Sequence, residues 1–126
     1  MKQISKSELI IMDVLWKKFP LGAADVAKSV TGQKWNIRTV KTLLSRLVQK
    51  GILNTEQEGR RYLYSPRLSK EDYGTKILNG ISESFYKGRN AALFLNLVKS
   101  NDLSTQDIDE ISALLEKLKA EKGDDQ

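Results

Sequence analysis

Apolar residues recur at helical intervals along the first part of the chain and predict three short helices. The first starts at Ser5 and Glu8, which have the spacing of a capping box, and it ends at Pro20 and Gly22. The second covers about residues 23–30. The third starts after Asn36 and ends at Gly51, because asparagine is a favourable N-cap and glycine commonly follows the last helical turn.

The third helix has two chemically different sides. Its apolar stripe consists of Ile37, Val40, Leu43, Leu44, Leu47 and Val48. The opposite side carries Arg38, Thr42, Ser45 and Gln49, flanked by Thr39 and Arg46. Arginine, threonine and glutamine can bind base edges and phosphates, so this side is a candidate nucleic-acid surface.

A β-hairpin is predicted directly after the third helix. Residues 52–57 and 60–65 are rich in Ile, Thr, Tyr and Leu, and Glu58-Gly59 separates them as a turn. Arg60 and Arg61 lie at its tip and return strand, where they could meet backbone phosphates. Three helices followed by a two-stranded wing are typical of a winged helix-turn-helix domain. We therefore predict a mostly α fold with a small β-wing.

The rest of the chain predicts three further amphipathic helices, in a second domain of residues 69–126 after a DNA-binding domain of residues 1–68. Together these helices carry more apolar surface than they can bury among themselves, and pairing with a second copy would cover it. The alternative is a monomer in which they fold back on the first domain. The candidate dimerisation residues are Tyr73, Ile77, Ile81, Phe85, Leu93, Leu97, Ile108, Ile111, Leu115 and Leu118.

Composition removes most enzyme classes. The 126 residues include no cysteine and no histidine, which excludes disulfides, thiolate metal sites and the commonest general base. We therefore expect no catalytic site, no metal and no cofactor. The start of the chain lacks the apolar core of a signal peptide, and no apolar run approaches a membrane span. A cytoplasmic protein without membrane insertion is the resulting expectation.

Charge is unevenly distributed along the chain. Residues 1–68 carry 13 basic and 5 acidic side chains, a net charge of +8, whereas residues 69–126 carry 8 and 11, a net charge of −3. A basic first part indicates contact with a polyanion. On charge alone, a basic surface without any partner is an equally good interpretation.

Three segments closely resemble the BlaI/MecI/CopY repressor family. These are residues 35–47 with Lys50-Gly51, residues 56–64 in the hairpin, and Glu8-Leu9 through Val14-Leu15-Trp16 in the first helix. Less specific likenesses occur at Tyr86-Lys87-Gly88, at residues 95–98 and from Asp102 to Leu115. The resemblance thus spans nearly the whole chain.

The resemblance implies a homodimer that represses transcription by holding a palindromic operator with TACA/TGTA half-sites in double-stranded DNA. By that likeness Arg38, Thr39 and Thr42 lie in the major groove, and Lys41 and Arg46 lie near phosphates or a guanine. Asn36 and Trp35 position the start of the helix, and Arg60 and Arg61 hold the flanking backbone. A protein-interaction module without specific DNA binding is the alternative, since winged helices also serve as docking domains.

Two departures from the family concern how the repressor is released. Copper-responsive members carry a C-terminal cysteine cluster that this chain lacks, so sensing of copper or zinc through thiolates is excluded. Members that respond to β-lactams are cleaved by a membrane-bound sensor protease at an Asn-Phe step. The corresponding step here is Asn96-Leu97. It is either a cleavage site or part of an ordinary dimer helix, and the sequence leaves both open.

Overall fold

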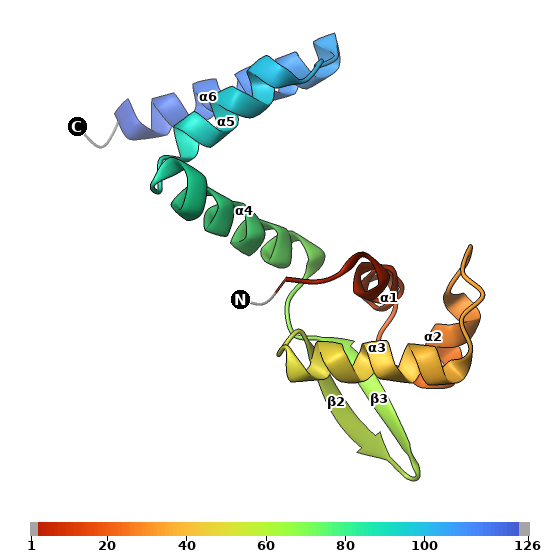
Figure 1. Cartoon of the computed structure of the whole chain (residues 1–126). Helices are drawn as coiled ribbons and strands as arrows, with labels where there is room; N and C mark the ends of the chain where they lie inside the picture. The colour runs from red at the N-terminus through yellow and green to blue at the C-terminus, as the bar shows by residue number, and fades with distance from the viewer. Residues whose placement is uncertain (1–2, 124–126) are drawn as a thin grey trace. The chain divides into compact units, whose positions relative to one another are not determined.

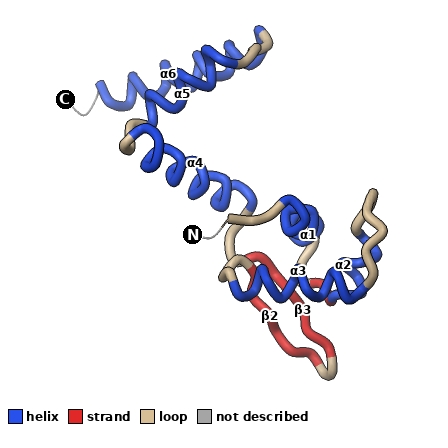
Figure 2. Tube along the Cα trace, in the orientation of Figure 1, coloured by secondary structure: helices blue, strands red, loops and turns tan. Residues whose placement is uncertain are grey.

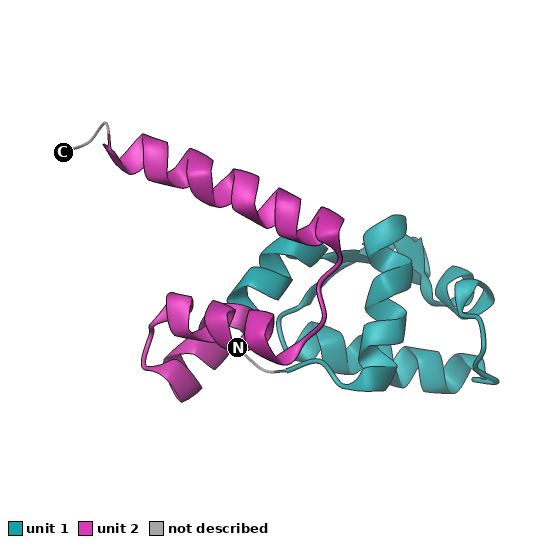
Figure 3. Ribbon diagram, turned by 90° about the horizontal axis from the view of Figure 1, so that it is seen from above, with its two compact units in different colours: residues 1–76 teal, residues 77–126 magenta. Residues whose placement is uncertain are grey.

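The computed structural model describes residues 3–123, which form nine helices and strands (Figure 1). In chain order they are α1 (Lys6–Lys17), β1 (Leu21–Gly22), α2 (Ala23–Ser29), α3 (Ile37–Gln49), β2 (Leu53–Glu58), β3 (Arg61–Pro66), α4 (Lys70–Tyr86), α5 (Asn90–Ser100) and α6 (Thr105–Gly123). They belong to two compact units that divide between Lys76 and Ile77, within α4 (Figure 3). The division lies later in the chain than the boundary expected at residue 68.

The core of the first unit is made by the apolar faces of its three helices and by the base of the hairpin. Its fully or almost fully buried members are Ile11, Met12, Leu15, Val26, Val40, Leu43, Leu44, Leu47, Ile52 and Leu53. Leu9 and Phe19, which lie at helical spacing from the buried Met12 and Leu15, are 42% and 58% exposed. The reason is that Ile11 rather than Leu9 points into the core, and α1 ends before Phe19.

The wing belongs to a three-stranded antiparallel sheet of order β1-β3-β2 (Figure 2). The hairpin of β2 and β3 closes at the pair Glu58–Arg61, and Gly59 takes a φ of +63°, as a two-residue hairpin loop requires. The strand β1 was not predicted. It pairs only Leu21 and Gly22 with β3, and so short a strand has no recognisable alternation of its own.

A buried carboxylate joins the start of α1 to the end of α3. Ser5 and Glu8 form the predicted capping box, and the Glu8 side chain is only 1% exposed. Its Oε1 accepts hydrogen bonds from Ser5 N at 2.8 Å and from Lys50 Nζ. Burial tends to raise the pKa of Glu8, but the hydrogen bonds from Lys50 and Ser5 outweigh it, so the pKa lies below the ordinary 4.5.

The first turns of α4 belong to the first unit because they pack on α1. Tyr73 is 8% exposed, its ring centroid is 6.1 Å from that of Trp16, and its hydroxyl accepts a hydrogen bond from Ile4 N at 3.2 Å. Trp16 Nε1 donates to Leu68 O at 3.0 Å, and Lys70 Nζ is 3.1 Å from Asp13 Oδ1. Tyr73 was expected to be a dimerisation residue, but these contacts place it inside the first unit.

The second unit consists of the rest of α4 together with α5 and α6. At the start of α6, Asp107 N donates to Ser104 Oγ at 3.0 Å and Ser104 N donates to Asp107 Oδ2 at 3.2 Å, which caps the helix reciprocally. Among its described residues, 77–123, only Ser82 is buried. No helix in the described part of the chain is long and apolar enough to cross a membrane.

Candidate DNA-binding surface

The polar side of α3 is exposed and forms a shallow hollow of about 590 Å³. Asn36 caps the helix by accepting a hydrogen bond from Thr39 N at 2.9 Å, which confirms it as the N-cap. The hollow is lined by Ile37, Arg38, Lys41, Thr42, Ser45, Arg46 and Gln49. It therefore combines three cationic side chains, three neutral polar ones and a single apolar one, without any carboxylate.

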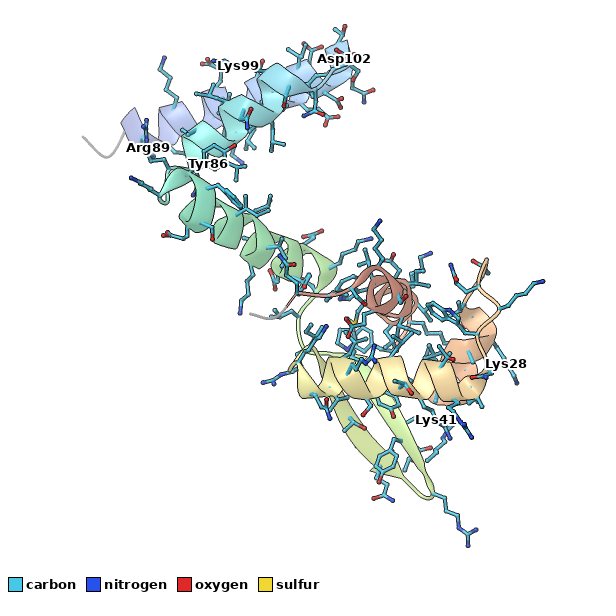
Figure 4. The ribbon with its side chains drawn as sticks, in the orientation of Figure 1. Lys28, Lys41, Tyr86, Arg89, Lys99 and Asp102 are labelled. Carbon is cyan, nitrogen blue, oxygen red and sulfur yellow. The ribbon has the colours of Figure 1, made fainter. Side chains whose placement is uncertain are left out.

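A second hollow of about 370 Å³ lies between the start of α2, the first turns of α3 and the wing. Arg60, Arg61, Tyr62 and Tyr64 line it from the wing, Gly22 to Asp25 from β1 and α2, and Ile37 and Lys41 from α3. Ile37 and Lys41 border both hollows, and Lys41 is labelled on α3 in Figure 4. The two hollows therefore form one continuous surface across α3 and the wing.

The two wing arginines lie in different surroundings. Arg61 Nη2 is 3.3 Å from Glu58 Oε1, and Arg61 Nη1 is 3.9 Å from Asp25 Oδ2. Within residues 3–123, Arg60 forms no ion pair. Arg60 is thus free to bind an anion, whereas Arg61 connects the wing to α2.

Six of the eight predicted DNA-binding residues line this surface: Arg38, Lys41, Thr42, Arg46, Arg60 and Arg61. Asn36 and Thr39 line neither hollow. Arg38, Lys41, Thr42 and Arg46 are exposed on α3, and Thr39 is half-buried. The Thr42 hydroxyl donates to Arg38 O at 3.0 Å, so its methyl group and the oxygen lone pairs remain available.

Sequence analysis missed three members of the surface. Ile37 was assigned to the apolar stripe but is 41% exposed, because it begins α3 and extends beyond the buried layer at Val40. Tyr62 is 52% exposed on the wing. Tyr64 is half-buried, and this burial, with a smaller effect from Tyr62, raises the pKa of its phenol. Tyr62 and Tyr64 are two residues apart on β3 and therefore lie on the same face of the strand, but their spacing does not tell whether that face is buried or exposed.

A capped helix with an exposed cationic face beside an arginine-bearing hairpin defines a winged helix-turn-helix DNA-binding protein, as the fold prediction stated. The family model for the penicillinase repressor matches residues 4–117. The chain belongs to the penicillinase repressor family, which confirms the resemblance described above.

Relatives and solved structures agree with this assignment. The chain is 34% identical over 121 residues to the penicillinase repressor of Bacillus licheniformis, covering 95% of this chain and 94% of that protein. It is 29% identical over 116 residues to the methicillin resistance regulatory protein MecI of Staphylococcus aureus, covering 91% and 94%. The solution structure of the DNA-binding domain of the repressor BlaI is similar to this chain, with 39% identity and a TM-score of 0.51. The match covers 56% of this chain and 88% of the BlaI domain.

Proposed function

We propose that this protein is a transcriptional repressor that binds a palindromic operator as a homodimer and catalyses no reaction. Each copy places α3 in the major groove of one half-site, and its wing lies along the flanking backbone. Arg38, Thr39 and Thr42 contact base edges, Lys41 and Arg46 contact phosphates or a guanine, and Asn36 holds the start of the helix. The BlaI domain that this unit resembles is itself a DNA-binding domain.

The observation that carries the proposal is the continuous surface of α3 and the wing. Of the residues that line the hollow on α3, three are cationic and none is acidic, so it suits a polyanion. A protein-docking face would be expected to carry an apolar or acidic surface instead. The exposed Arg38, Lys41 and Arg46 therefore favour DNA over the docking alternative.

The homodimer is supported by the apolar surface of the second unit. Large apolar side chains there are 38–79% exposed: Leu78, Phe85, Phe94, Leu95, Leu97, Ile108, Leu114, Leu115 and Leu118. No apolar side chain of residues 77–123 is buried, so three amphipathic helices have no core within one chain. A second copy covers such a surface with twofold symmetry, and it also presents two α3 helices to a palindrome.

Release by proteolysis is a second proposal, and it rests on α5. Asn96 lies in the middle of this helix and donates from Nδ2 to the hydroxyl of Tyr86. Leu97 is 48% exposed, and α5 has no buried residue, so local unwinding of the Asn96-Leu97 step costs little. A membrane-bound sensor protease is the proposed partner. Fragments that begin at Leu97 in derepressed cells support this route, and release of intact chains contradicts it.

Fluorescence anisotropy on the full chain tests the main proposal. A palindromic duplex with TACA and TGTA half-sites is compared with a scrambled duplex at two salt concentrations. Selective, strongly salt-dependent binding with two chains per duplex is expected. Equal weak binding to both duplexes, followed by no preferred sequence in a selection from randomised duplexes, would refute specific repression.

The dimer is tested separately by sedimentation of two charge variants. Phe85→Glu places a carboxylate at a side chain that is 79% exposed in one chain, and the variant is expected to sediment as a monomer. Lys99→Glu changes charge on an exposed polar position of α5 and is expected to remain a dimer. If Phe85→Glu remains a dimer at all concentrations, the interface lies elsewhere.

A further inference from the structure

Ile37 is an apolar side chain exposed in the middle of a polar surface. Of the described residues that line the hollow on α3, it is the only apolar one, and it is 41% exposed. Arg38 follows it directly, and Lys41 lies one helical turn further on the same side. An aliphatic group is therefore held among charged groups that bind DNA.

The local structure does not require an isoleucine at this position. Asn36 provides the cap of α3 through its side-chain oxygen, and the buried layer of the helix begins at Val40, which is 0% exposed. A single exposed apolar side chain is common on protein surfaces, so the position of Ile37 among cationic and polar side chains, rather than its exposure, is what points to a partner. The position of Ile37, in the first turn of α3, is where recognition helices contact base edges.

The chemistry of the major groove offers one apolar partner. Every base-pair edge there presents hydrogen-bond donors and acceptors, and only thymine adds an apolar group, its 5-methyl. We propose that Ile37 is a specificity-determining residue that contacts the 5-methyl group of one thymine in each half-site. Arg38 and Lys41 hold the polar groups on either side of this contact. The inference rests on the proposed placement of α3 in the major groove.

Replacing thymine by deoxyuridine removes only the methyl group and keeps base pairing. The probe is the preferred palindrome obtained by selection of the full chain on randomised duplexes, and each thymine of one half-site is replaced in turn. The wild-type chain is expected to lose about fourfold in affinity at one thymine, the factor that burying one methyl group contributes. At the other thymines the loss is expected to be smaller.

Two variants assign the effect to Ile37. Ile37→Ala is expected to bind the thymine duplex more weakly than the wild type does. It is also expected to bind the thymine duplex and the deoxyuridine duplex with equal affinity. Val48→Ala changes a half-buried residue of α3 that lines neither hollow, and it should keep the wild-type preference. Thermal unfolding of each variant shows whether it is folded. The deoxyuridine substitutions tested with the wild-type chain need no variant protein.

Three results would overturn the inference. The wild type binds every substituted duplex equally, or Ile37→Ala keeps the loss at the same thymine, or Val48→Ala abolishes it as well. Each of them leaves selective binding to the palindrome intact and refutes only the contact of Ile37. If selection finds no preferred sequence, the placement of α3 in the major groove is refuted together with the inference.

Discussion

Removing the Glu8 carboxylate is expected to destabilise the first unit strongly. Glu8 accepts hydrogen bonds from Ser5 N and Lys50 Nζ, and Lys50 Nζ also donates to Gln3 O at 2.9 Å. One side chain thereby connects the N-terminal segment, the first turn of α1 and the residue that ends α3. Because α3 is the proposed recognition helix, the same contacts hold its C-terminal end in place.

The magnitude follows from two contributions. Loss of a capping interaction costs about 1 kcal/mol, and breaking a buried ion pair costs about 3–5 kcal/mol when the remaining charge is stranded. Lys50 is 24% exposed and can turn toward water, and Glu8 Oε2 accepts no hydrogen bond within the described residues, so the second contribution is reduced. We expect Glu8→Ala to lower the free energy of unfolding by about 2–3 kcal/mol, or Tm by about 10–20 °C.

The pH dependence gives an independent check. The pKa of Glu8 is lower in the folded chain than its ordinary value of 4.5. Its contribution to stability is therefore present above that ordinary value and is lost as the pH falls through the folded pKa. Glu8→Gln cannot ionise, so its stability should fall less steeply with acid than that of the wild type.

Unfolding followed by circular dichroism between neutral and acid pH measures both effects. The matched control is Glu56→Ala, which removes an exposed carboxylate on β2 and should change stability by less than about 0.5 kcal/mol. A loss below about 1 kcal/mol for Glu8→Ala would contradict this account of the ion pair. So would an acid dependence of Glu8→Gln identical to that of the wild type.

Four further predictions concern the wing and the division of the chain. Arg60→Ala should reduce the magnitude of the negative slope of log affinity against log salt concentration by about 0.9 for each lost phosphate contact. Arg61→Ala should leave that slope unchanged but weaken binding, because it removes the cation that pairs with Asp25. Adding Asp25→Asn to this variant should restore affinity. A slope change equal to that of Arg60→Ala would instead identify Arg61 as a phosphate contact. A fragment of residues 1–76 should fold as a monomer in sedimentation and bind the palindrome more weakly than the full chain. Gly59→Val should cost about 1–2 kcal/mol in thermal unfolding, because a β-branched residue is strained at a φ of +63°.

Much of the first unit could be predicted from local chemistry. The capping box at Ser5, the N-cap at Asn36 and the turn at Gly59 depend on residues within a few positions of one another. The helical stripe of α3 likewise marks Val40, Leu43, Leu44 and Leu47 as buried, and all four are. Such signals need no knowledge of the rest of the fold.

Other features depend on which surfaces meet. Periodicity gave Ile37 and Val40 the same side of α3, but the buried layer stops before Ile37, and this leaves it on the DNA surface. Tyr73 continues the spacing of Ile77, Ile81 and Phe85, yet it is buried in the first unit, beside the Trp16 ring and hydrogen-bonded to Ile4 N. Equal spacing of apolar residues within a helix cannot reveal which of them a neighbouring helix covers.

The amino-acid sequence by itself determined the order of the helices and the hairpin in this protein, several of their caps and turns, and the cationic side of the third helix, because local backbone preferences and hydrophobic periodicity encode them. Only the tertiary structure decided that Arg61 is paired with Asp25 and Glu58 while Arg60 has no ion-pair partner among residues 3–123, and that Glu8 is buried against Lys50. The partners in these contacts, apart from Glu58, lie far away in the sequence. Long-range packing brings them together, and no pattern along the chain records it.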